Sequence, residues 1–142
     1  MITVRHLLDR KGRELFSIGP DEPVLEAVRL MSERHVGALL VMRGGELVGI
    51  VSERDYARKV VLLGRSSSDT SVSQIMSTPV VTVAPESSVE ECMRLMTARR
   101  IRHLPVLERG RTIGVISIGD LVKAVIDEQQ HTIEQLESYI RS

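Results

Sequence analysis

Apolar residues are distributed along the chain in two ways, one typical of amphipathic helices and one typical of buried strands. Between residues 24 and 31 they fall at i, i+3, i+4 and i+7, on one helical face, and the same spacing returns between residues 89 and 96. The runs 38–42 and 104–107 are short and continuously apolar. These patterns predict a domain that contains both helices and strands.

Both helical stretches lie within the same predicted order of elements: strand, helix, strand, strand, helix. Pro23 fits the first turn of the first helix, and Ser87 or Ser88 is the expected N-cap of its counterpart. Glycine-containing turns at residues 43–46 and 108–111 reverse the chain between strands. The predicted strands are residues 15–18, 38–42 and 47–51 in the first copy and residues 80–83, 104–107 and 112–116 in the second.

The chain contains an internal repeat. Residues 18–61 align with residues 83–126 without a gap, and prolines, glycines, serines and aspartates coincide. A unit of this size buries little surface alone, so we expect the two copies to pack together with pseudo-twofold symmetry and two related clefts. The predicted organisation is a first copy at 1–64, a polar, flexible linker at 65–71, a second copy at 72–126 and a helical tail at 127–142.

Each copy ends its last strand on the same short motif. Gly-Ile-Val-Ser-Glu-Arg-Asp at residues 49–55 returns as Gly-Val-Ile-Ser-Ile-Gly-Asp at residues 114–120. A serine where a buried strand meets a helix presents free N–H groups and a hydroxyl, which suit a phosphate, and the aspartate can accept from both ribose hydroxyls. The same Ser-x-x-Asp pattern is also a capping box that only starts a helix. From the residues alone, both interpretations remain open.

The duplicated unit, Leu-Pro-Val at residues 104–106 and the two Gly-apolar-apolar-Ser-x-x-Asp endings resemble a tandem pair of cystathionine β-synthase (CBS) domains, known as a Bateman module. The resemblance covers residues 4–126, and Ser-Glu-Arg-Asp-Tyr at residues 52–56 is similar to small stand-alone CBS-pair proteins. It implies an α+β fold of the α/β-type CBS kind, made of two β-α-β-β-α repeats, with the additional C-terminal helix.

The resemblance also implies a function. Members of the family hold adenine nucleotides (AMP, ADP, ATP, NAD(H)) or S-adenosylmethionine between the repeats, and they pair as homodimers. They signal to a regulated protein, here unknown, by conformational change. In the family the motif serine contacts phosphate and the aspartate contacts ribose. An apolar slot takes the adenine, and the resemblance places Val80, Val81, Ile50 and Ile116 in that slot. The candidate nucleotide-binding residues are therefore Ile50, Ser52, Arg54, Asp55, Thr78, Val80, Val81, Arg102, His103, Ile116, Ser117 and Asp120.

The copies differ around the motif. Gly37-Ala38 in the first copy corresponds to Arg102-His103 in the second, and Arg54 corresponds to Gly119. The second cleft is thus suited to a phosphate, while Arg54, Arg58 and Lys59 add charge to the first; the alternative is that these cations are solvated surface residues. Two unlike clefts favour two unlike ligands, such as a mononucleotide and a dinucleotide.

Other function classes fit the sequence less well. A constitutive interaction or dimerisation module with no ligand is the main alternative. An enzyme is not expected, because no residues pair as nucleophile and base and no phosphate-binding glycine loop is present. We expect no metal requirement. His6, His35 and His131 lack partners at ligand spacing and are expected at the surface.

Composition narrows the partners. The 142 residues carry 19 basic and 19 acidic side chains and few aromatic rings, which argues against a nucleic-acid partner. No stretch approaches the roughly 18 apolar residues of a spanning helix, and residues 1–15 lack a signal-peptide core. We therefore expect a cytoplasmic protein without a membrane partner. The single cysteine excludes an internal disulfide, and Cys92, Met31 and Met96 are expected in the core.

The tail has its own apolar pattern. Ile126, Ile133, Leu136 and Ile140 fall near a and d positions of a helix that continues from Ser117. Such a helix either folds back on its own module or provides a dimer contact.

Overall fold

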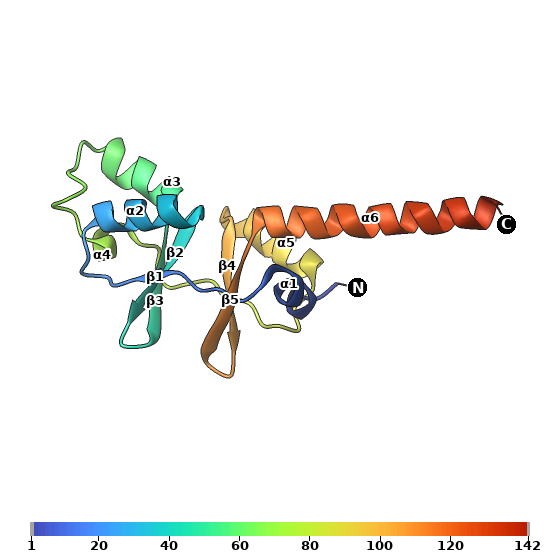
Figure 1. The fold of residues 1–142 in the computed structure, drawn as a ribbon. Coiled ribbons are helices and arrows are strands. Elements are labelled where there is room, and N and C mark those ends of the chain that lie inside the picture. The colour runs from blue at the N-terminus through green and yellow to red at the C-terminus, as the bar shows by residue number, and fades with distance from the viewer. Residues whose placement is uncertain (1, 142) are drawn as a thin grey trace. The chain divides into compact units, whose positions relative to one another are not determined.

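The computed structural model describes residues 2–141, which form two compact units. The first-repeat unit comprises residues 15–81, and the second-repeat unit comprises residues 2–14 together with residues 82–141. Each unit combines a small sheet with helices (Figure 1), so the predicted α+β fold class is confirmed. The compact units follow different bounds from the sequence repeat, because residues 2–14 belong with the second copy.

The first-repeat unit contains a sheet in the order β1-β2-β3. β1 runs parallel to β2, and β2 pairs antiparallel with β3, which sets Leu40 opposite Ile50. The predicted turn between β2 and β3 is confirmed, with positive φ at Gly44 and Gly45. The elements are β1 (Ser17–Ile18), α2 (Val24–Arg34), β2 (Ala38–Arg43), β3 (Glu46–Ser52), α3 (Glu53–Tyr56), the π-helix η1 (Ala57–Val61) and α4 (Val72–Ile75).

The second-repeat unit has the same order with one strand fewer. A strand predicted at residues 80–83 is wrong, since only Val83 forms a parallel bridge, to Val106. In the first copy Leu40 donates its N–H to the carbonyl of Phe16 at 3.1 Å, but the corresponding residue, Pro105, has no N–H to donate. The elements are α1 (Val4–Lys11), α5 (Val89–Arg99), β4 (His103–Glu108), β5 (Arg111–Ser117) and α6 (Ile118–Arg141).

The apolar stripes of α2 and α5 form the centre of each core. Met31, Cys92 and Met96 are buried, as predicted, and burial raises the pKa of the Cys92 thiol to about 11. Ser88 is the N-cap of α5, where its hydroxyl accepts from the Glu91 N–H. Pro23 is the N-cap of α2 and not, as predicted, a residue of its first turn.

A polar segment supplies the missing cap of α2. The carbonyls of Thr70 and Ser67 accept from the N–H groups of Val24 and Leu25, at 2.8 and 3.0 Å. Thr70 is buried. The segment 65–71, expected to be a flexible linker, is therefore held against the start of α2, where first-turn N–H groups need acceptors.

Each repeat packs against a helix that precedes the other repeat in sequence. α1 packs on β5, where Leu8 lies over Gly114, and α4 packs on β3, where Met76 lies over Gly49. A Cβ at Gly114 or Gly49 would come 2.5 Å from the nearest atom of Leu8 or Met76. The repeated glycine therefore allows a helix to approach the strand closely.

The tail continues α6 as one helix of 24 residues, as predicted. Residues 126–141 are all exposed, so the tail is not folded back on its unit, and Figure 1 shows it extending beyond α1 and α5. No helix within residues 2–141 is long and apolar enough to cross a membrane.

Candidate functional site

The motif of the second-repeat unit forms a corner between β5 and α6. Asp120 Oδ2 accepts from the Ser117 N–H at 2.7 Å, and the Asp120 N–H donates to Ser117 Oγ at 3.2 Å. This reciprocal pattern is a capping box, so the helix start predicted at Ser117 is confirmed. We call Ser117, Asp120 and their contacts the second corner.

Lys11 completes the second corner, although it is not among the residues predicted from the sequence. Its Nζ, from the end of α1, donates to Asp120 Oδ2 at 2.6 Å and to the carbonyl of Val115 at 2.7 Å. Nothing in the local sequence indicates this contact, because it joins residues far apart in the chain. Among the described residues, Asp120 Oδ1 has no hydrogen-bond donor, and the side chain of Asp120 is 24% exposed.

Burial and neighbouring polar groups shift two pKa values at the second corner. Burial raises the pKa of Asp120, but hydrogen bonds from Lys11 and Ser117 outweigh it and leave the pKa below its ordinary value. Burial, followed by the positive charge of Lys11, lowers the pKa of His103. At neutral pH the corner therefore holds a carboxylate, an ammonium and a neutral imidazole.

The first corner, between β3 and α3, has the same capping box with a different lysine. Asp55 Oδ2 accepts from the Ser52 N–H at 2.9 Å and from Ser52 Oγ at 3.0 Å, and the Asp55 N–H donates to Ser52 Oγ. Lys59 contacts Asp55 Oδ1 at 3.1 Å and donates to the carbonyl of Ile75 in α4. Both carboxylate oxygens of Asp55 are therefore engaged, and its side chain is only 14% exposed.

Four of the candidate nucleotide-binding residues lie in the first-repeat unit, near one edge of its sheet. Ile50 and Ser77 exchange two backbone hydrogen bonds, of 3.2 and 2.8 Å, which hold Ser77, the residue before Thr78, against β3. Thr78 is exposed, and Ile50, Val80 and Val81 are half-buried. Arg54 is exposed on α3.

Ile116 does not lie where the predicted adenine slot requires it. Its side chain is completely buried in the second-repeat unit, so it cannot line an open slot. Side chains alternate along a strand, and the position equivalent to the half-buried Ile50 is Val115, whereas Ile116 corresponds to the buried Val51. The sequence reasoning chose the wrong face of β5.

The basic residues of the second copy lie beside its corner. His103 is opposite Ser117 in the β4–β5 ladder, where the first copy places Ala38 opposite Ser52. Arg102 is exposed, and its carbonyl accepts from the N–H of Ile118 at 2.9 Å. The second corner therefore has a basic side chain at each of two positions where the first has Gly37 and Ala38, and Arg102 is the one that is positive at neutral pH.

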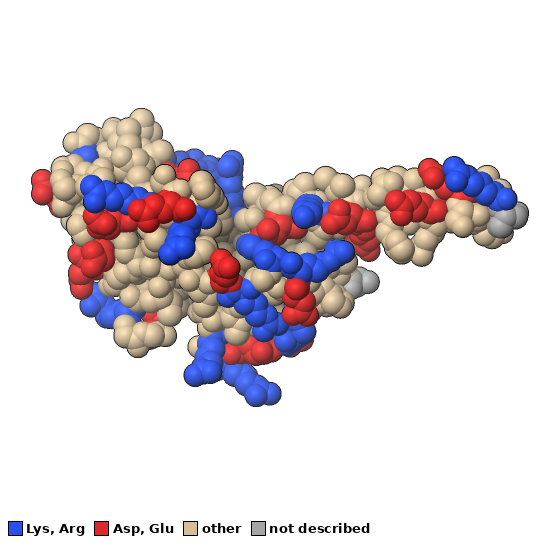
Figure 2. Space-filling model, in the orientation of Figure 1, with Lys and Arg blue, Asp and Glu red and all other residues tan. Residues whose placement is uncertain are grey.

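The rest of the described surface offers little support for a second kind of binding site. Residues 2–141 contain no group of three or more potential metal ligands. Acidic and basic side chains are interspersed over the face drawn in Figure 2. A hollow of the second-repeat unit, between the segment 82–87 and α5, contains no predicted site residue.

Comparisons with known proteins give the family. A model described as the CBS domain matches residues 4–62 and 72–127. The mitochondrial CBS domain-containing protein CBSX3 of Arabidopsis thaliana is 45% identical over 126 residues, which are 85% of this chain and 61% of that protein. This chain thus spans less than two thirds of that relative. A solved structure from Burkholderia ambifaria, named as a candidate signal-transduction protein with CBS domains, is 51% identical, with a TM-score of 0.87 and coverage of 90% of this chain and 96% of its own.

A more distant structure shares only the fold. The CBS domain pair of protein MJ0100, solved in complex with 5′-methylthioadenosine and S-adenosyl-L-methionine, is 19% identical. Its TM-score is 0.80, over 90% of this chain and 98% of that chain.

Proposed function

The chain belongs to the CBS domain family, with two copies of the domain in tandem, and we propose that it is a non-enzymatic regulatory module that binds adenine nucleotides. The ligands are AMP, ADP or ATP, with NAD(H) as a further candidate. The adenosine ligands of the MJ0100 pair support this chemical class. The alternative is a constitutive interaction module, which the complete capping boxes at both corners favour, because these bonds serve the helix starts without a ligand.

The open carboxylate oxygen of Asp120 is the observation that carries the proposal. A ribose hydroxyl needs an acceptor, and Asp120 Oδ1 is an acceptor with no donor among the described residues. The ammonium of Lys11 and the guanidinium of the exposed Arg102 supply positive charge for a phosphate. The second corner is therefore the stronger site for a mononucleotide.

The first corner takes a different part in the proposal. Ile50, Val80 and Val81 offer apolar surface for an adenine ring, with Thr78 beside them. Because Ser52 and Lys59 occupy both oxygens of Asp55, a ribose there must displace one of them. We expect weaker binding at the first corner, or a ligand of another kind.

Regulation follows as a shift between conformations. A ligand that binds one arrangement of the module more tightly increases the population of that arrangement. A partner protein that recognises this arrangement then responds to the ligand. The ligand also stabilises the fold, by about 2.7 kcal/mol at a hundredfold excess over its Kd.

The test is thermal unfolding of the full chain with millimolar AMP, ADP, ATP, NAD(H) and S-adenosylmethionine. We expect at least one nucleotide to raise the Tm, and Asp120→Asn to abolish that rise. Asp127→Asn is the matched control, because Asp127 is an exposed residue of the same helix. Circular dichroism verifies that both variants are folded. If none of the five ligands raises the Tm of the unaltered protein, the proposal is wrong and the chain is a constitutive interaction module.

A further inference from the structure

The tail of α6 presents an apolar face that its own unit does not cover. Near its start the helix buries Leu121 and Ala124 where it packs with α5 and α1. The opposite side carries large aliphatic side chains that are 43–80% exposed. Most of the stability of a helix in a protein comes from packing of its apolar face, so a partner that covers this face would stabilise the tail. The exposed residues of this tail stripe are Val122, Ile126, Ile133, Leu136 and Ile140.

The tail stripe has the spacing of a coiled coil. With Ile126, Ile133 and Ile140 at position a, Val122 and Leu136 fall at d over about three heptads. Gln129 occupies the remaining d position, and a polar core residue lowers the stability of such a pair.

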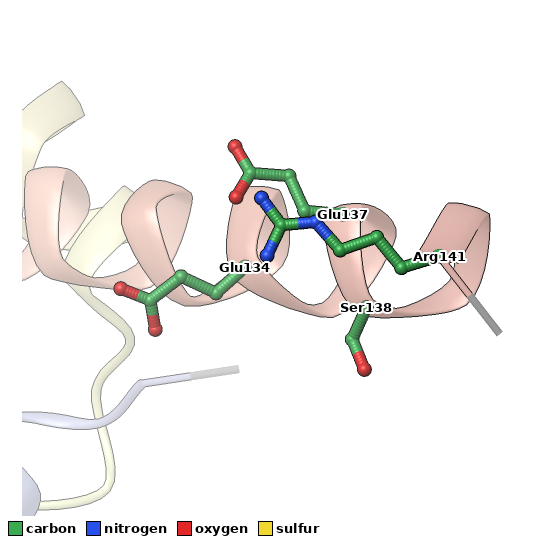
Figure 3. A pocket seen from close by; sticks show the side chains of 4 residues that line it. All are labelled: Glu134, Glu137, Ser138 and Arg141. Carbon is green, nitrogen blue, oxygen red and sulfur yellow. The ribbon is translucent and has the colours of Figure 1, made fainter.

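Two charges beside the tail stripe are complementary. Lys123 and Glu137 both fall at position e, and within the described chain neither forms an ion pair or hydrogen bond. Figure 3 shows the carboxylate of Glu137 projecting from the helix, away from Ser138. In an antiparallel pair of helices, e positions face each other, and the register that matches the apolar layers sets Lys123 beside Glu137 of the second copy.

We propose that the α6 tail is a self-association surface whose partner is the α6 tail of a second copy, in antiparallel orientation. The apolar layers pair Val122 with Ile140 of the second copy and Ile126 with Leu136 of the second copy. The twofold axis crosses the two helices at the level of residue 131. Two Lys123–Glu137 pairs flank the core by symmetry. In a parallel pair these two residues would lie about 20 Å apart along the axis and could not meet. This surface is independent of the nucleotide sites.

Disulfide trapping tests the orientation. Thr132 lies at g, next to the axis, and an antiparallel pair sets it beside Thr132 of the second copy, so we expect Thr132→Cys to form a covalent dimer under mild oxidation. His131→Cys is the matched control, because position 131 lies on the outer face of the same turn, and we expect it to cross-link at least tenfold more slowly. The native Cys92 is buried and does not compete. Faster trapping through Ile126→Cys, which meets its copy only in a parallel pair, would overturn the proposal, as would equal rates at 131 and 132.

Charge reversal provides the second test, read as the trapping rate of Thr132→Cys. Lys123→Glu or Glu137→Lys alone sets like charges together at two places and should slow trapping by about tenfold. The double variant restores opposite charges and should regain most of the rate. Ile133→Glu, which puts a charge in the core, should abolish trapping. A double variant that traps as slowly as the two single effects combined would overturn the proposed pairing.

Discussion

The two corners share a serine and an aspartate at the same spacing, but they differ in the origin of the lysine. Lys59 comes from η1, which directly follows the helix that the motif begins, and it occupies the Asp55 oxygen that Ser52 leaves free. Lys11 comes from a distant helix and shares Oδ2 of Asp120 with Ser117, so Oδ1 stays open. One sequence motif thus yields a closed carboxylate in one unit and a half-open carboxylate in the other.

The largest expected effect concerns the helices packed on the two glycines. Gly114→Ala forces the new Cβ against Leu8, which is completely buried, and should cost about 3 kcal/mol of unfolding free energy. Gly49→Ala meets the half-buried, flexible Met76 and should cost about 1 kcal/mol. Urea denaturation measures both. Equal costs would mean that Leu8 yields as readily as Met76.

A smaller effect separates the two lysines. Lys11→Met removes the largest influence that lowers the pKa of Asp120, so that pKa should rise in a carboxyl-carbon NMR titration. A lowered carboxyl pKa stabilises the fold above the pKa of the unfolded chain, and this contribution is lost as the pH falls through the folded value. The variant should therefore lose about 1 kcal/mol at neutral pH, a figure kept small because solvent screens the partly exposed Lys11, and little in strong acid.

Lys59→Met is the matched variant in the first corner. Asp55 keeps both hydrogen bonds from Ser52, so we expect the smaller loss of stability there. A larger loss for Lys59→Met than for Lys11→Met would contradict the difference between the two corners.

The smallest effect concerns His103, whose counterpart in the first copy is Ala38. Because burial and Lys11 lower the pKa of His103, the unfolded chain binds the proton more readily than the fold does. Stability should therefore fall as the pH drops through the ordinary value of 6.5. His103→Ala should flatten the unfolding free energy between about pH 7 and pH 5. An unchanged slope would show that His103 does not carry this dependence.

The sequence predicted those features that depend on neighbouring residues. The order of elements in the first copy, the helix start at Ser117 and the burial of Cys92 follow from periodicity and capping patterns within each repeat. It missed features set by contacts across the fold. Lys11 reaches Asp120 from the other end of the chain, and Pro105 shortens a strand pairing through the absence of one N–H group.

The error at Ile116 has a different cause. The predicted slot combined Ile50 of one copy with Ile116 of the other, although the two positions are not equivalent in the repeat. Side chains alternate between the two faces of β5, so a shift of one residue exchanges the buried face for the outer face. This shift moved the prediction from the half-buried Val115 to the buried Ile116. The assignment of the remaining site residues stays a prediction until a ligand is bound.

Each repeat is covered by the helix that precedes the other repeat, α1 on β5 and α4 on β3. This exchange limits how the chain can be shortened. A fragment that holds one repeat and its own preceding helix carries a helix suited to the other repeat, while its glycine strand lacks cover. A fragment of the first copy and a fragment of the second would each supply the helix that the other lacks.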